Sequence, residues 1–103
     1  MLMTEFTTNV VLDSNTTKQW SVACQAKLDT GAARTSIDTK LSRFLRLKKC
    51  GKTKVSNAMG SQRRKLVELT LSWEGNSYMV EASVTDRGEL STPIIIGRDI
   101  LGE

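Results

Sequence analysis

Residues 66 to 84 constrain the fold of this chain most strongly. Apolar side chains alternate with polar ones from Val67 to Trp73, and the alternation resumes from Tyr78 to Val84. A period of two puts one set of side chains on one face of a strand, so the pattern predicts two strands that each bury a single face. Glu74-Gly75-Asn76 separates them and is typical of a hairpin turn. The stretch therefore predicts an antiparallel hairpin.

Most of the remaining chain also has strand patterns. Ile94-Ile95-Ile96 is apolar on both faces, which favours a central, buried strand. A helical turn or two should follow Asp38 as the cap, with Leu41, Phe44 and Leu45 on one apolar face. Further strands are expected over residues 4–12, 20–28, 35–37 and 52–58, and a short helix from residue 98 to 101. These segments predict one small all-β domain over residues 1–103, closed or sandwich-like, with one or two helical turns.

Several classes of protein are excluded or disfavoured by composition. The chain has no His and two cysteines, Cys24 and Cys50. Without His, a Ser-His-Asp or Cys-His nucleophile is impossible, and nothing is spaced like a zinc site, so we expect no metal and no cofactor. No apolar run approaches the roughly 18 residues of a membrane span, and the first residues lack a secretory pattern. We therefore expect a cytoplasmic protein that does not engage a membrane.

The positive charge is concentrated in one segment. No acidic residue lies between Thr39 and Val67. The basic residues there are Lys40, Arg43, Arg46, Lys48, Lys49, Lys52, Lys54, Arg63, Arg64 and Lys65. The segment is either a solvated surface or a site for an anionic partner, an acidic peptide or a nucleic acid. Phe44 is its one aromatic residue, so it lacks the stacking side chains of single-strand binders, and we do not expect nucleic acid as a partner.

Two separate motifs carry the expected chemistry. "LDTGA" at residues 28–32 ends one apolar strand, and "PIIIGRDIL" at residues 93–101 ends another. Together, in this order, they resemble the retropepsin-like aspartic peptidases, including the retroviral proteases. The stretch "VELTLSWEGNSYMVEASVTDRGELSTPIIIGRDIL" is also similar to the bacterial family known as ATP-dependent zinc proteases, whose members are retropepsin-like. The resemblance implies a small closed retropepsin-like β-barrel.

The resemblance also implies the site residues. Asp29 would supply a catalytic carboxylate, Thr30 would hydrogen-bond across a dimer, and Gly31 would let substrate approach the backbone. Gly97 and Arg98 would support the Asp29 loop, with Asp86, Asp99 or a group of the other subunit as the partner of Arg98. Aspartic peptidases need two carboxylates, and this chain has one Asp-Thr-Gly. The resemblance therefore implies a homodimer.

Substrate would be held by two segments in this interpretation. Ala32 and Arg34 would border the cleft, and Ala58, Met59 and Gly60 lie where a retropepsin has the hairpin tip that closes over a peptide. Because basic residues flank this tip, we expect acidic peptides to be preferred. The alternative is a catalytically inactive retropepsin-fold module for binding or oligomerisation.

Overall fold

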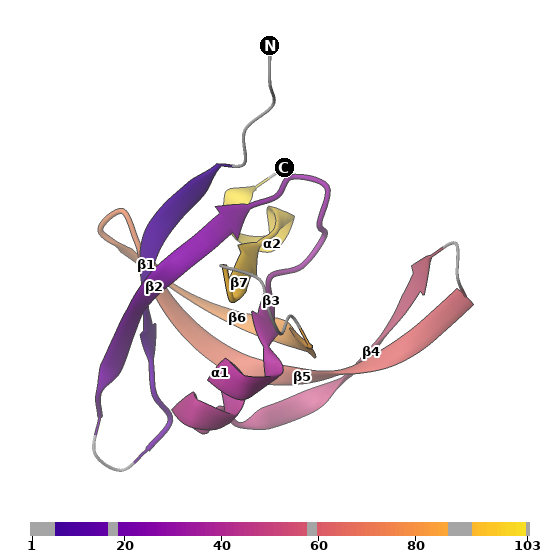
Figure 1. Ribbon diagram of the computed structural model, residues 1–103, viewed down its shortest axis with the longest axis horizontal. Helices are drawn as coiled ribbons and strands as arrows, with labels where there is room; N and C mark the ends of the chain where they lie inside the picture. The colour runs from indigo at the N-terminus through magenta and orange to yellow at the C-terminus, as the bar shows by residue number, and fades with distance from the viewer. Residues whose placement is uncertain (1–5, 17–18, 58–59, 87–91, 103) are drawn as a thin grey trace.

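The computed structural model describes residues 6–16, 19–57, 60–86 and 92–102, and their strands form a closed ring (Figure 1). The elements in chain order are β1 (Thr7–Asp13), β2 (Ser21–Leu28), β3 (Ser36–Asp38), α1 (Thr39–Leu45), β4 (Lys49–Asn57), β5 (Gly60–Trp73), β6 (Asn76–Thr85), β7 (Ile94–Ile96) and α2 (Arg98–Leu101). The hydrogen-bonded order is β1-β2-β7-β3-β6-β5-β4, and β1 also pairs with β5. That last pairing closes the first six strands of the order into a barrel, so the all-β prediction is confirmed.

The predicted hairpin of residues 66–84 is the longest part of the barrel wall. β5 and β6 pair from Leu66↔Ser83 to Trp73↔Asn76, which leaves a two-residue turn. Glu74 and Gly75 both have positive φ, 51° and 81°, the conformation that such a turn needs for its twist to match the strands. Val67, Leu69, Leu71 and Ala82 of the expected inner face are buried, and the others on that face are partly buried against the core: Trp73, Tyr78, Val80 and Val84. The alternation was therefore a sound guide to the core.

β7 lies in the middle of the barrel wall. It pairs in parallel with β2 and antiparallel with β3, and Ile94 and Ile96 are fully buried. The core combines these with Val10 and Leu12 of β1, Ala26 of β2, Ile37 of β3, Leu45 of α1 and the inner face of the β5–β6 hairpin. Ile94-Ile95-Ile96 is thus the central strand that its apolar pattern predicted, but it is not buried on both faces, because Ile95 is half-buried and lines a groove.

The helix α1 follows its predicted cap but differs in one side chain. The Asp38 carboxylate accepts a hydrogen bond from the Lys40 backbone N–H at 3.0 Å and caps the helix. Leu45 is buried, whereas Phe44 is 61% exposed and packs edge-on against Trp20, with ring centroids 5.0 Å apart. The expectation that Phe44 shares the core face was wrong. The short helix α1 places Leu45 over the core, whereas the Phe44 side chain lies outside it, against Trp20.

The strands β4 and β5 extend beyond the barrel as a two-stranded arm (Figure 1). Both strands are longer than the sequence predicted: β4 begins at Lys49, and β5 begins at Gly60 and not near Leu66. The polar residues 60–65 lack the apolar alternation of a half-buried strand. They form a strand because they pair with β4, and not because one of their faces is buried.

In the described part of the chain, no helix is long and apolar enough to cross a membrane.

Candidate active site

The site begins where β2 leaves the barrel wall. Leu28 is paired with Ile96, and the next backbone N–H, that of Asp29, donates to the Ile96 carbonyl at 3.0 Å. The chain then turns, since the Ala32 N–H donates back to the Asp29 carbonyl at 3.1 Å. Asp29 therefore sits at the carboxyl ends of two adjacent parallel strands, the position at which sheets commonly carry functional loops.

The Asp29 side chain is held by its own loop and stays accessible. Its Oδ1 accepts a hydrogen bond from the Gly31 backbone N–H at 2.9 Å. A Cβ on Gly31 would lie 3.2 Å from that same Oδ1, which is a tight contact. Asp29 is half-buried, and Thr30 and Gly31 are exposed. Glycine at position 31 thus lets the amide approach the carboxylate.

The helix α2 fastens this loop from the far end of the chain. The Arg98 N–H donates to the Ala32 carbonyl at 2.8 Å, and the Arg98 guanidinium donates through Nη1 to the Thr30 carbonyl at 3.1 Å. Gly97 packs directly against the loop: a Cβ there would lie 2.7 Å from the Arg34 carbonyl carbon and 2.8 Å from the Ala32 carbonyl oxygen. Gly97 and Arg98 therefore lie where a loop support was expected.

A second fastening joins α2 to the end of the same loop. The carboxylate of Asp99 accepts two hydrogen bonds from Thr35: from its backbone N–H at 2.9 Å and from its hydroxyl at 2.7 Å. The Thr35 hydroxyl in turn accepts from the Gly97 N–H at 3.3 Å, and Thr35 is fully buried. The sequence leaves Asp99 open as a partner of Arg98, but both oxygens of the Asp99 carboxylate accept hydrogen bonds from Thr35. These hydrogen bonds between Thr35 and Asp99 are called the clamp. The one sequence signal for the clamp is the threonine six positions after Asp29.

Arg34 lies beside the loop, and its guanidinium group contacts Glu81 of β6. Its Nη1 donates to the Glu81 carbonyl at 3.2 Å and lies 3.7 Å from the Glu81 carboxylate. The pair is largely exposed, with 40% and 60% of the two side chains accessible, so its contribution to stability is small. Arg34 is thus anchored to β6 at the edge of the site.

A groove of about 590 Å³ separates the Asp29 loop from the arm. Its lining comes from the loop, the arm, the start of β3, the end of β6 and the middle of β7: Gly31, Ala32, Ala33, Arg34, Ser36, Thr53, Lys54, Arg64, Ser83, Thr85 and Ile95. Every charged side chain in that lining is basic. Gly60, exposed with φ 121°, begins the strand of the arm that returns to the barrel, while Ala58 and Met59 lie outside the described residues.

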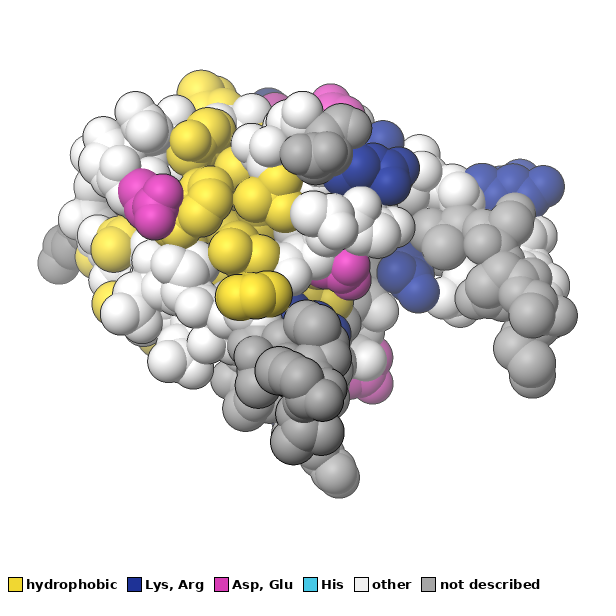
Figure 2. Space-filling model, turned by 90° about the horizontal axis from the view of Figure 1, so that it is seen from above, with side chains coloured by type: hydrophobic (Ala, Val, Ile, Leu, Met, Phe, Trp, Pro, Cys, Tyr) yellow, Lys and Arg dark blue, Asp and Glu magenta, His cyan; other side chains and the backbone are white. Residues whose placement is uncertain are grey.

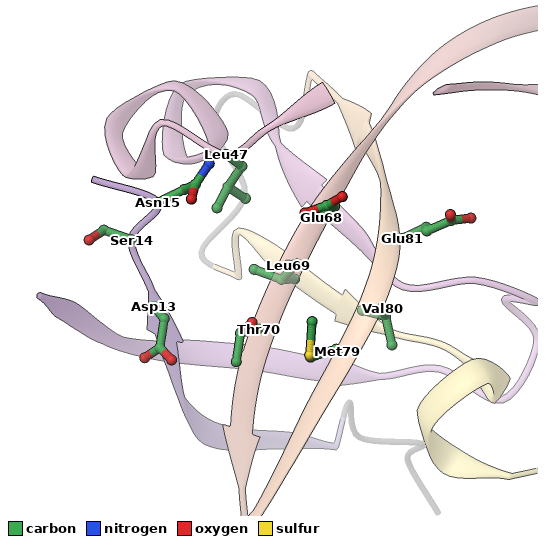
Figure 3. Close-up of a pocket in the computed structure, with 10 residues that line it drawn as sticks. All are labelled: Asp13, Ser14, Asn15, Leu47, Glu68, Leu69, Thr70, Met79, Val80 and Glu81. Carbon is green, nitrogen blue, oxygen red and sulfur yellow. The ribbon is translucent and has the colours of Figure 1, made fainter. Parts of the chain in front are cut away.

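A separate hollow of about 270 Å³ lies on the outer face of the β5–β6 hairpin (Figure 3). Its lining includes three carboxylates, those of Asp13, Glu68 and Glu81. Glu68 and Glu81 face each other in the strand register, and Met79 and Val80 supply apolar surface. None of the expected site residues lines it, so it is not part of the Asp29 site.

Metal ligands do not gather in the described part of the chain, where no group of three or more His, Cys, Asp or Glu residues is placed to hold an ion. Cys24 and Cys50 are free thiols. Burial raises the pKa of Cys24, and burial followed by the nearby Glu81 and Glu68 raises the pKa of Cys50. Both effects favour the neutral thiol over the thiolate that binds metals or attacks substrates.

Comparison with solved structures defines the fold class. The EIAV protease determined with the inhibitor HBY-793 superposes with a TM-score of 0.73 at 25% identity, over 98% of this chain and 88% of that one. The Simian Foamy Virus (mac) protease gives 0.61 at 14% identity over 92% of each chain. A retropepsin-like aspartic protease from Rickettsia conorii gives 0.54 at 12%, over 100% of this chain and 85% of that one. No family model and no curated protein matches the sequence. The chain has a retropepsin-like fold.

Proposed function

We propose that the protein is an aspartic endopeptidase that acts as a symmetric homodimer, with Asp29 of each subunit at the two-fold axis. The observation that carries the proposal is the Asp29 loop, which ends β2 and is fastened at Thr30, Ala32 and Thr35 by the residues that open α2. A loop held at three points keeps a carboxylate in one position, as a catalytic group requires. The likeness to retroviral proteases supports the same conclusion.

The chemistry follows from two carboxylates at close range. Two such groups cannot both ionise, so the pair shares one proton around a bound water. One carboxylate takes a proton from the water as the water attacks the scissile carbonyl, and the other donates a proton to the carbonyl oxygen. Gly31 leaves room beside Asp29 for the water and the peptide, since it has no Cβ.

A second copy supplies the second carboxylate in this proposal. The chain has one Asp-Thr-Gly, because Asp13-Ser14-Asn15 lacks the glycine. The face seen from above in Figure 1, where α2 and the end of β2 lie, gathers hydrophobic side chains (Figure 2). Phe6 is 62% exposed next to β2, since its carbonyl accepts from the Leu28 N–H, and Ile100 and Leu101 of α2 are half-buried. Such a patch suits an isologous interface.

The groove favours acidic peptides in this proposal. Arg34, Lys54 and Arg64 are its charged side chains, and Arg34 is already partly neutralised by Glu81. Arg64 is therefore the better candidate for a substrate carboxylate. We expect Arg64→Gln to lower kcat/KM for peptides with Asp or Glu beside the cleaved bond by about tenfold, from loss of one charged contact, and Arg34→Glu to lower it by repulsion from the new carboxylate. Neutral peptides should be cleaved at unchanged rates, and an equal loss on both peptide classes would contradict the preference.

Cleavage of a peptide library at mildly acidic pH tests the central proposal. Wild type should cleave, and Asp29→Asn should lose activity by more than about 10³-fold, since the amide can neither take nor give the shared proton. Asp13→Asn is the matched control, because Asp13 also ends a strand and lies away from the Asp29 loop. Activity that survives Asp29→Asn would overturn the aspartic mechanism, and loss on chelation would indicate a metal. A folded dimer without activity on any peptide would point to the inactive binding module.

A further inference from the structure

The arm formed by β4 and β5 carries an ordered arrangement of basic side chains. In the register of the two strands, Lys52 faces Lys65 and Lys54 faces Arg63. These four residues, named here the basic tetrad, are two positions apart along each strand and so lie on the same face of the arm. All four are exposed. Lys and Arg side chains gather on the arm in Figure 2.

The tetrad places four positive charges close together, and no acidic side chain of the described residues neutralises them. Directly opposed residues have Cβ atoms about 4.5–5.5 Å apart, and like charges at that spacing destabilise a strand pair. No acidic residue occurs between Thr39 and Val67, and none of the four side chains forms a salt bridge within the part of the chain that the structure describes. An anion that lies across two such pairs would relieve the repulsion in both.

The chemistry of the tetrad selects among anionic partners. The centres of protein interfaces are depleted of charged residues, whereas all four members of the tetrad are charged. Segments that bind membranes combine basic residues with apolar ones, and the tetrad contains no apolar residue. A nucleic-acid backbone needs only regularly spaced cations, and successive members along one strand are about 6.8 Å apart. A two-stranded ribbon also fits the major groove of a duplex.

We propose that the basic tetrad binds the phosphate backbone of duplex nucleic acid without sequence preference. Proteins that bind single strands stack bases on aromatic side chains, and the basic segment has one aromatic residue, Phe44. Binding to the backbone of a duplex does not need such stacking. The strand positions between tetrad members, Thr53 and Arg64, line the groove by the Asp29 loop, and Lys54 borders it as well. Thr53 and Arg64 therefore belong to the groove face of the arm, and the tetrad alternates to the other face, with Lys54 as the one member that also borders the groove.

Fluorescence anisotropy with a fluorescein-labelled mixed-sequence DNA duplex tests the proposal. Four neutralised phosphates predict a slope of log K against log salt near −3.6, so wild-type affinity should fall roughly 100-fold between about 50 and 200 mM salt. The variant Lys52→Gln, Lys54→Gln, Arg63→Gln, Lys65→Gln should lose at least about tenfold in affinity at 50 mM salt and most of that slope. Asp29→Asn should bind like wild type, which separates this proposal from proteolysis.

A second variant controls for net charge. Lys40, Arg43, Arg46 and Lys48 are exposed on α1 or just after it, and their change to Gln removes the same charge. That variant should keep affinity within about threefold and most of the salt slope. No duplex binding at 50 mM salt, equal losses in the two variants, or tighter binding to polyglutamate or to phosphatidylserine vesicles at the same ionic strength would overturn the proposal. The tetrad variant should melt at or above the wild-type temperature, and a lower midpoint would contradict the repulsion between its pairs.

Discussion

Gly97 shows how a single residue decides the geometry of the candidate site. Its φ of −98° is open to any residue, so the need for glycine comes from space and not from backbone conformation. The backbone of residues 32 to 34 occupies the volume that a Cβ at position 97 would fill. Backbone atoms cannot rotate away as the end of a flexible side chain can. The close approach in turn allows the hydrogen bonds from α2 to the loop.

Gly97→Ala is therefore expected to destabilise the protein by about 2 kcal/mol or more, as overpacking of a tight contact does. The matched control is Gly51→Ala, where a Cβ would meet Leu66 Cδ1 at an ordinary 3.8 Å. Urea unfolding followed by tryptophan fluorescence compares the two midpoints. Equal midpoints for both variants would show that the loop moves aside easily.

Cys24 gives a residue-scale prediction in pH. Burial raises the pKa of its thiol above the ordinary value, so the thiolate, which is the nucleophile, forms at higher pH in the folded chain than in the unfolded one. In a Cys50→Ser background, iodoacetamide alkylates Cys24 alone. The rate of this alkylation should rise at a higher pH in the native protein than in the protein unfolded in urea. The same linkage makes the stabilising contribution of the neutral thiol decline as alkaline pH deprotonates it. Coincident pH profiles in both states would contradict the effect.

At the scale of elements, the loop and α2 stabilise each other. α2 has four residues, too few to be stable as an isolated helix. Its contacts with Thr30, Ala32 and Thr35 join segments more than sixty positions apart, since the Thr35–Asp99 separation is 64. Each element therefore orders the other. A substitution in α2 should therefore alter the position of Asp29 through the loop, even where the substituted residue does not contact Asp29.

Asp99→Ala tests this coupling. The change leaves the N–H and hydroxyl of the fully buried Thr35 without their carboxylate acceptors, at about 1–3 kcal/mol for each group. We expect a loss of at least about 2 kcal/mol in unfolding free energy and a lower kcat for any peptide that wild type cleaves. Asp13→Ala, an exposed carboxylate at a strand end, should stay within about 0.5 kcal/mol of wild type. Identical stability for the two variants would show that the hydrogen bonds between Thr35 and Asp99 do not stabilise the loop.

At the scale of the whole molecule, two surfaces of different character lie apart from each other. The apolar face near α2 suits a second copy, and the arm carries positive charge away from the barrel (Figure 2). The separation would let the proposed dimer form while the arm binds the proposed anionic partner. It also means that the proposed dimer can be broken without changing the arm.

Phe6→Asp should weaken the dimer and reduce peptide cleavage in parallel. Burial of a phenylalanine side chain contributes about 1.5–3 kcal/mol, and a symmetric interface would include it twice, so the dimer dissociation constant should rise at least about a hundredfold. Phe44→Asp is the matched control, since Phe44 is 61% exposed and Phe6 62%. Sedimentation velocity at micromolar concentration compares the two. Equal dissociation by both variants, or a wild-type monomer that cleaves peptides, would contradict the dimer proposal.

Sequence reasoning recovered the parts of this protein that depend on neighbouring residues. The β5–β6 hairpin followed from its alternation and turn, the cap of α1 from Asp38, and the central place of Ile94-Ile95-Ile96 from its apolar character. It failed at Phe44, because helical periodicity does not reveal how far a short helix is covered. It also could not choose the partner of Arg98, since that choice depends on distances across the fold.

By itself, then, the sequence determined the strand pattern and the presence of one Asp-Thr-Gly loop, because side-chain period and turn preference act over a few residues. Only the tertiary structure decided that the β1–β5 pairing closes the barrel and that Thr35 and not Arg98 engages Asp99. It alone also opposed Lys52 to Lys65 across the arm. These relations join residues from 13 to more than 60 positions apart, and their register is set by closure and packing of the whole ring.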